Sequence, residues 1–285
     1  MNFPRRLPVL GLALALVLAL AGLFGAAQFA RAEVPYEPVR AQAGKDVIWI
    51  PTSQSLVDEM LLMAKVTSND LLYDLGSGDG IIAVTAGKKY GARAVGIEFN
   101  PKMAEFATQR AKKEGVSDKV TFINGDIFAE DFSQATVVTM YLLPTLNLRL
   151  RPTLLDMPPG TRIVSHAFSM QEWEPDLTST AGSGTAYLWI VPAKVAGEWN
   201  IKGLEGAAPG KLTLTQSFQQ VGGTMTVAGV SQPLLGVQLS ADKLSFSFMG
   251  ADKAMQSITA TVTAGNLSGM HTANGSIKAV EATRL

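Results

Sequence analysis

The chain has 285 residues, enough for one or two domains with hydrophobic cores, which excludes a minimal disulfide-stapled module. Its 24 lysine and arginine residues balance 24 aspartate and glutamate residues, so no overall basic charge attracts nucleic acid. It has no cysteine, which excludes disulfides, a thiolate nucleophile and a cysteine metal site.

The most apolar segment lies at the N-terminus. Two arginines precede a run over residues 7–30 that carries no charged side chain, and an Ala-Arg-Ala sequence ends at Ala32. This pattern is typical of a secretory leader cleaved after Ala32, but the run is also long enough to span a bilayer as an uncleaved anchor. We therefore expect residues 1–32 to be a signal peptide or membrane anchor. The protein is then exported or membrane-associated through residues 7–30, on a side that the flanking charges leave open.

The middle of the chain, residues 47–192, alternates apolar runs with amphipathic stretches. This pattern favours strands alternating with helices about a mainly parallel sheet. A first helix is expected after Pro51 and Thr52, with Ser55 and Asp58 spaced as a capping box. We expect an α/β domain over residues 33–192.

A glycine-rich loop follows the first predicted strand, residues 71–75. The sequence DLGSGDG occupies residues 74–80, and a helix is expected over 81–89. Glycines at such a junction permit a sharp turn and let a ligand approach the backbone amides. The dinucleotide fingerprint places its third glycine one residue later. The carboxylates of Asp74 and Asp79 flank the loop, which disfavours a diphosphate and suits a ligand with ammonium and sulfonium groups.

Two further acids end predicted strands. Glu98 ends a strand over 94–98, 18 residues after Gly80, where a ribose diol would need an acceptor. Asp126 follows a strand over 120–123 and is placed to accept from an exocyclic amine. Taken alone, Glu98 also fits a helix cap and Asp126 an ordinary turn. Because the carboxyl ends of parallel strands meet at one edge of a sheet, together they predict a nucleoside-binding site there.

These residues resemble the class I S-adenosylmethionine-dependent methyltransferases over approximately residues 47–192. More narrowly, the chain is similar to bacterial relatives of the mitochondrial lysine methyltransferases that modify the ATP synthase c-subunit. The segments that carry this closer resemblance are IPT at 50–52, DLGSGDG at 74–80, YLLP at 141–144, VSH at 164–166 and WEPD at 173–176.

The resemblance implies a Rossmann-like methyltransferase domain and S-adenosylmethionine as the cofactor. In relatives, the loop holds the methionyl portion, the acid matching Glu98 binds the ribose hydroxyls and the acid matching Asp126 lies near the adenine. An acid commonly follows the histidine that aligns with His166, whereas this chain has Ala167. The cofactor-binding residues that the resemblance implies are Asp74, Gly76, Ser77, Gly78, Gly80, Glu98, Asp126 and Thr52.

Methyl transfer from a sulfonium mostly requires a positioned and desolvated nucleophile, so few catalytic residues are needed. Tyr141 and Asn147 follow a predicted strand over 136–141, and His166 ends the next one. Tyr141 is the candidate that orients an acceptor amine, and His166 is the candidate general base. The alternatives are packing for Tyr141, a helix cap for Asn147 and a structural role for His166.

The sequence lacks two other signatures. There is no Asp/Asn-Pro-Pro-Tyr motif, which with the neutral charge argues against methylation of nucleic-acid bases. No His/Asp/Glu cluster has metal-ligand spacing, which argues against a metal-dependent methyltransferase. The acceptor is therefore expected to be a protein or a small molecule, with no nucleic-acid partner and no metal.

The composition changes after residue 192, where glycine, threonine and serine become frequent. Short alternating strands separated by turn residues predict a small antiparallel barrel or sandwich over 193–285. Such a domain could hold an apolar ligand, but no convergent polar group appears, so a packing or docking module is favoured. His271 is expected at its surface.

Three functions follow from these observations. The favoured one is S-adenosylmethionine-dependent methyl transfer to a protein lysine amine, with a small molecule or lipid as the alternative acceptor. A nicotinamide oxidoreductase is disfavoured by the glycine spacing, and an exported non-catalytic ligand-binding module is the third. Export conflicts with a cytosolic methyl donor. An anchor that leaves the domain inside, a loss of catalysis, or an external supply of donor would each remove that conflict.

Overall fold

The computed structural model describes residues 1, 36–182, 184–204, 209–250 and 253–285. The expected signal peptide or anchor lies outside these residues apart from Met1. The chain divides into two compact units, residues 1–37 and 38–285, and both sheets described below belong to the second. The predicted boundary at residues 192 and 193 therefore stays a prediction. Within the described ranges, no helix combines the length and the apolar character that crossing a membrane requires.

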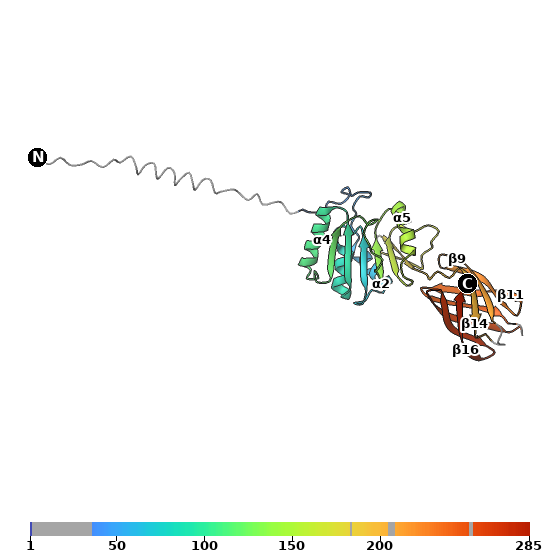
Figure 1. The fold of residues 1–285 in the computed structure, drawn as a ribbon. Helices are drawn as coiled ribbons and strands as arrows, with labels where there is room; N and C mark the ends of the chain where they lie inside the picture. Colours follow the sequence, from blue (N-terminus) through green and yellow to red (C-terminus); the bar gives the residue numbers. More distant parts are fainter. Residues whose placement is uncertain (2–35, 183, 205–208, 251–252) are drawn as a thin grey trace. The chain divides into compact units, whose positions relative to one another are not determined.

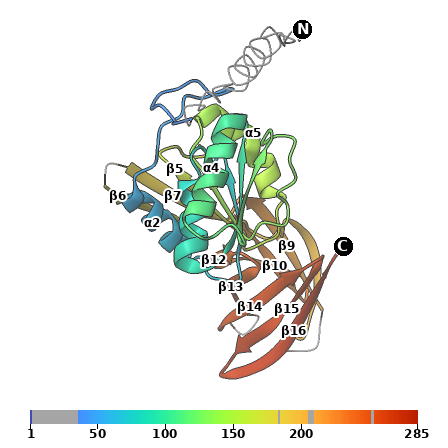
Figure 2. The same ribbon diagram turned by 90° about the vertical axis from the view of Figure 1, so that its left-hand side faces the viewer.

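The first sheet has seven strands in the order β3-β2-β1-β4-β5-β7-β6. Figures 1 and 2 show this sheet with helices beside it. Strands β1 to β5 are parallel, whereas β7 is antiparallel to β5 and β6 is antiparallel to β7. The predicted mainly parallel sheet is confirmed. Its strands are β1 (Leu71–Leu75), β2 (Arg93–Glu98), β3 (Val120–Asn124), β4 (Val137–Met140), β5 (Arg162–His166), β6 (Leu177–Ala181) and β7 (Gly184–Ile190).

Helices cover this sheet on both faces and divide its core into two clusters. One cluster joins α2 and α3 to side chains such as Val137, and the other joins α5 to the neighbouring Val138. Successive strand residues point to opposite faces, which explains why these neighbours enter different clusters. The helical segments are α2 (Gln54–Met63), α3 (Ile81–Thr85), the π-helical turn η1 (Ala86–Tyr90), α4 (Pro101–Lys113) and α5 (Pro144–Leu155).

The expected capping box of the first helix is wrong. The N-cap of α2 is Ser53, which makes no side-chain capping bond. The hydroxyl of Ser55 instead lies 3.2 Å from that of Ser53, and Asp58 accepts hydrogen bonds from Gln54 and Lys89. The side chains of Gln54 and Lys89 therefore bind the Asp58 carboxylate in place of a backbone N–H at the start of the helix.

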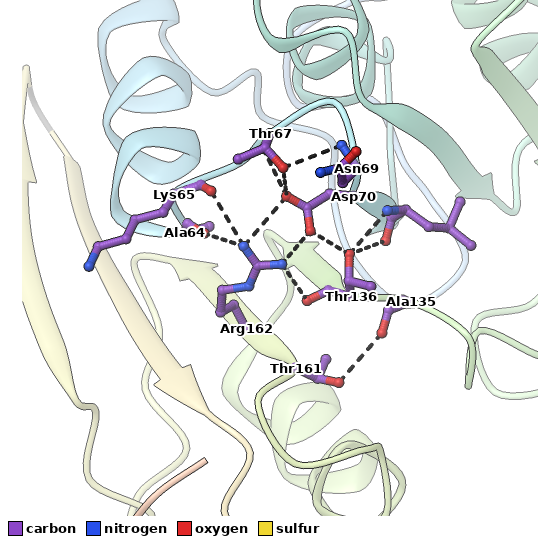
Figure 3. A network of polar contacts seen from close by, with 10 residues as sticks. Ala64, Lys65, Thr67, Asn69, Asp70, Ala135, Thr136, Thr161 and Arg162 are labelled. Carbon is purple, nitrogen blue, oxygen red and sulfur yellow. Dashed lines mark hydrogen bonds and ion pairs between the residues drawn. The ribbon is translucent and has the colours of Figure 1, made fainter. Parts of the chain in front are cut away.

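An ion-pair network joins the amino ends of three strands (Figure 3). Arg162 pairs with the buried carboxylate of Asp70 and donates to the carbonyl of Ala64 at 2.8 Å. Asp70 also accepts from the hydroxyl of Thr136 at 2.7 Å. Burial acts to raise the pKa of Asp70, but the hydrogen bonds from Arg162 and Thr136 lower it below its usual value. The network ties β1, β4 and β5 together at their amino ends.

The second sheet contains nine antiparallel strands in the order β11-β10-β9-β8-β16-β15-β14-β13-β12. Its edge strands β11 and β12 are separated in sequence by Leu234 alone, so the sheet must curl until its edges meet, which makes it nearly a barrel. This confirms the predicted antiparallel class. The strands are β8 (Gly197–Lys202), β9 (Gly210–Ser217), β10 (Gln220–Val227), β11 (Val230–Pro233), β12 (Leu235–Ser240), β13 (Lys243–Met249), β14 (Met255–Thr263), β15 (Asn266–Ala273) and β16 (Ser276–Arg284).

Apolar side chains fill the inside of this second sheet. The cavity among them has a volume of about 10 Å³, room for at most one water molecule. The packing alternative is therefore favoured over a ligand cavity in this domain.

The expected surface position of His271 is wrong. This side chain is 1% exposed, its ring stacks on Phe248 with centroids 6.1 Å apart, and its Nε2 lies 2.9 Å from an amide oxygen of Gln256. His271 shares the inward-facing positions of β15 with Leu267 and Ala273. Strand alternation thus places a polar ring in the core, where a glutamine satisfies it.

Candidate functional site

A cavity of about 580 Å³ lies at the carboxyl ends of the parallel strands. Open sheets of this type bind ligands at that edge because the loops leaving successive strands converge there. Eight of the ten sequence-predicted site residues line the cavity, whereas Gly80 and His166 do not. Binding by the eight stays a prediction. They are Thr52, Asp74, Gly76, Ser77, Gly78, Glu98, Asp126 and Tyr141.

The glycine loop forms a tight turn between β1 and α3. The backbone N–H groups of Gly76 and Ser77 both donate to the carbonyl of Ile97, at 2.9 and 3.0 Å. Gly78 has φ +54°, and a Cβ there would lie 2.5 Å from Nε1 of Trp49. Only glycine fits this position without displacing the indole.

Gly80 has a different role from the other loop glycines. A Cβ at Gly80 would lie 2.5 Å from the ring of Phe122 and 2.9 Å from Ala107. The residue lets α3 begin close against β3 and α4, so the structure gives it a packing role rather than a place in the cavity.

The carboxylate of Glu98 is held in one orientation by two backbone groups. Gly78 N donates to Oε2 and Asn100 N donates to Oε1, each at 2.9 Å. Each oxygen keeps a further lone pair for a ligand hydroxyl. The geometry is compatible with the predicted ribose contact.

Asp126 is held from two sides. Its Oδ2 pairs with Nζ of Lys45 at 2.6 Å, and its Oδ1 accepts from the backbone N–H of Phe128 at 3.0 Å. The hydrogen bond from Lys45, followed by that from Phe128, lowers the pKa of Asp126. The carboxylate is thus ionised and able to accept a hydrogen bond.

Asp74 is the most buried acid of the cavity, with 2% of its surface exposed. Thr139 donates to its Oδ1 at 2.7 Å. Burial, reinforced by the negative charges of Asp79 and Glu98, raises the pKa of Asp74 to about 7 despite that hydrogen bond. A cationic ligand beside Asp74 would favour the ionised carboxylate, so ligand charge and protonation are coupled here.

The two predicted catalytic residues, Tyr141 and His166, stack on each other. The rings of Tyr141 and His166 lie 3.7 Å apart at 29°, and Nδ1 of His166 lies 3.1 Å from the hydroxyl oxygen of Thr52. Burial lowers the pKa of His166 to about 4. Tyr141 lines the cavity and His166 does not, so the geometry favours a supporting role for His166 over that of a general base.

Asn147 does not cap a helix. It is buried inside α5, where its Nδ2 donates to Oγ of Ser165 at 3.2 Å and to the carbonyl of Phe168 at 3.1 Å. Ser165 Oγ also donates to that carbonyl, at 2.7 Å. These bonds fix the loop that brings the Phe168 ring to the cavity wall.

Sequence reasoning missed the hairpin that precedes the first helix. Ala41 N donates to the carbonyl of Trp49 at 2.8 Å, and Trp49 N donates to that of Gln42 at 2.9 Å. Residues 42–50 all line the cavity. The apolar run over 47–50 is the signal that could have indicated an extended segment beside the site.

Comparisons with known proteins place this site among methyltransferases. A family model described as the ANTKMT methyltransferase domain matches residues 74–177. A protein-lysine N-methyltransferase from Saccharolobus islandicus (strain REY15A) is 40% identical over 151 residues, which cover 51% of this chain and 94% of that protein. The lysine N-methyltransferase of the ATP synthase c-subunit from Homo sapiens is 30% identical over 146 residues, which cover 51% of this chain and 61% of that protein.

Solved structures that are similar to this chain include a methyltransferase with a bound cofactor product. It is described as an RNA methyltransferase from Salinibacter ruber in complex with S-adenosyl-L-homocysteine. It is 48% identical with a TM-score of 0.50, and the match covers 51% of this chain and 96% of that chain.

Proposed function

Because this chain belongs to the family of S-adenosylmethionine-dependent protein-lysine methyltransferases, we propose that it transfers a methyl group from this cofactor to the ε-amine of a lysine in a protein acceptor. The observation that carries the proposal is the cavity at the carboxyl edge of the sheet, where the glycine loop and strand-end carboxylates meet. A nicotinamide oxidoreductase also uses a glycine loop and a strand-end acid, but the glycine spacing at 76–80 disfavours it.

The charges of the cavity fit the cofactor. Five of its lining residues are aspartate or glutamate and one, Lys45, is basic. A diphosphate would be repelled by this lining, whereas a ligand with a sulfonium and an ammonium group is attracted. When bound, the cofactor supplies a methyl group activated by the positive sulfur. Asp74 would hold its methionyl ammonium, Glu98 its ribose and Asp126 its adenine, while the loop glycines would let it approach the backbone.

The acceptor end of the cavity differs in character. We assign the acceptor end to Tyr141, Leu143 and Phe168, which line the cavity and supply aromatic and aliphatic surface without a charged group. A lysine amine must be neutral to attack a methyl group, and a desolvating wall lowers the pKa of such an amine. Tyr141 can accept a hydrogen bond from the amine through its phenolic oxygen and align the lone pair. With the cofactor bound, the role of these residues would be to hold the neutral amine, freed of water, with its lone pair toward the activated methyl group.

The site of action is proposed from the N-terminal apolar run. Residues 7–30 carry no charge and suit a membrane anchor, and the methyl donor is a cytosolic metabolite. We therefore propose that the enzyme is membrane-associated with its catalytic domain facing the donor. Alkaline phosphatase fused after Lys45 in the native host tests this. An absence of phosphatase activity is expected, and strong extracytoplasmic activity would overturn it.

The acceptor class is tested with labelled donor. Membrane and soluble fractions of the host are incubated with the full-length chain and methyl-labelled S-adenosylmethionine, and the products are treated with protease or ribonuclease. Label released by protease and recovered as methyllysine is expected. Label released by ribonuclease would instead favour the acceptor class in the description of the Salinibacter protein.

A matched pair of variants makes this assay specific. Glu98→Gln removes one carboxylate charge from the cavity and is expected to reduce labelling at least tenfold. Glu105→Gln removes an equal charge from an exposed position of α4 and is expected to retain it. Equal labelling by both variants would contradict the proposed cofactor site.

A further inference from the structure

The hairpin over residues 38–50 carries a lysine into the proposed cofactor cavity. A hydrogen bond from Gly44 N to the carbonyl of Val47, 2.8 Å long, closes its turn, and Lys45 lies within that turn. Among the described residues that line the cavity, Lys45 is the only lysine or arginine. Lys45 and Asp46 form the tip of the hairpin, between the two residues that this bond joins.

The ammonium of Lys45 occupies contacts that a purine base would use. Its Nζ lies 2.6 Å from Oδ2 of Asp126 and 4.8 Å from the ring centroid of Phe99. A carboxylate oxygen is the acceptor for an exocyclic amine, and an aromatic ring is a stacking surface for a base. Oδ1 of Asp126 already accepts from the backbone N–H of Phe128 and Oδ2 is held by Lys45, so an exocyclic amine competes with Lys45 for space and acceptor sites at this carboxylate.

We propose that Lys45 is an internal competitor for the adenine end of the cofactor site, which the cofactor must displace from Asp126 when it binds. This inference rests on the proposed function because it takes the ligand to be an adenosyl compound. Lys45 thereby weakens cofactor affinity, and a movement of the hairpin tip that withdraws it strengthens binding.

The ion pair of Lys45 and Asp126 is exposed enough for the cofactor to displace it. The side chains of Lys45 and Asp126 are 39% and 30% exposed, so solvent screens their attraction and the pair is weak enough to open. At its base the hairpin is held more firmly, since Trp49 packs on Gly78 and pairs with Ala41 and Gln42. The tip can therefore move while the base stays in place.

The test is isothermal titration of S-adenosylhomocysteine into the full-length chain, purified in mild detergent. Lys45→Met removes the ammonium and keeps the aliphatic length. It is expected to bind about two- to fivefold more tightly than the wild type, the range that an exposed ion pair supports. Lys88→Gln removes an exposed charge paired with Glu114, outside the cavity, and is expected to bind as the wild type does.

Two further measurements identify the partner of the lysine. The difference between wild type and Lys45→Met is expected to shrink as sodium chloride increases, because salt screens the competing pair. In an Asp126→Asn background, Lys45→Met is expected to change affinity less than twofold, because the competition has already been removed.

The outcomes separate the two hypotheses. Equal or weaker binding by Lys45→Met while the wild type binds would overturn the internal competitor and leave the cofactor class intact. A wild type that fails to bind while Lys45→Met binds would support strong competition. Absence of binding by both proteins would refute the proposed function, and the competitor with it.

Discussion

Cofactor affinity is expected to depend on pH through the single buried acid of the cavity. Burial and the charges of Asp79 and Glu98 raise the pKa of Asp74 to about 7. In the free protein this carboxylate is then ionised in about one tenth of molecules at pH 6 and about nine tenths at pH 8. A ligand ammonium binds only the ionised form well. The affinity for S-adenosylhomocysteine should therefore rise about tenfold between pH 6 and pH 8, or about 1.4 kcal/mol.

The sign follows from proton linkage. Binding favours the ionised carboxylate, so it lowers the pKa of Asp74 and releases a proton wherever the free protein holds one. Titration calorimetry in two buffers of different ionisation enthalpy should detect about 0.9 protons released per ligand at pH 6 and about 0.1 at pH 8. His166, whose pKa is lowered to about 4 by burial, does not titrate in this window.

Asp74→Asn is the decisive variant. Its amide oxygen still accepts the hydrogen bond that Thr139 donates, but it has no proton to lose, so its affinity should be low and independent of pH. Asp131→Asn changes an exposed acid outside the cavity and should keep the wild-type slope. A wild-type affinity that is constant between pH 6 and pH 8, or the same slope in Asp74→Asn, would refute the reasoning.

Three further results are expected. Arg162→Met leaves the buried carboxylate of Asp70 without its ion-pair partner. It should lower the free energy of unfolding by about 3–5 kcal/mol in urea denaturation; a loss below about 1 kcal/mol would contradict the role of the network. Gly78→Ala should weaken S-adenosylhomocysteine binding at least tenfold, because the added Cβ would clash with the indole of Trp49 in the cavity wall. Its control Gly115→Ala has an equally left-handed backbone and no atom within 4 Å, and should lose only about 1–2 kcal/mol of stability while binding normally; equal binding losses would reject the steric argument. His166→Phe keeps a ring against Tyr141 and should retain methylation within about tenfold of wild type, whereas removal of a true general base costs about 100-fold or more.

Local sequence patterns determined the framework of the catalytic domain. The apolar runs at 71–75 and 94–98 predicted strands that the structure confirms as β1 and β2, because alternation and β-propensity act between residues close in sequence. The glycine spacing at 74–80 and the acids that end successive strands also fixed where the cavity lies, since parallel strands deliver their carboxyl ends to one edge.

Tertiary structure alone decided the environment of individual side chains. The pair of Lys45 and Asp126 joins residues 81 positions apart, and the contact of Thr52 with His166 spans 114 positions. The spacing of residues along the sequence does not indicate contacts over such separations. The raised pKa of Asp74 likewise comes from burial by several elements at once. The sequence determines which groups can ionise or form hydrogen bonds. The fold determines how much water and which charges surround each group, and these set its pKa and reactivity.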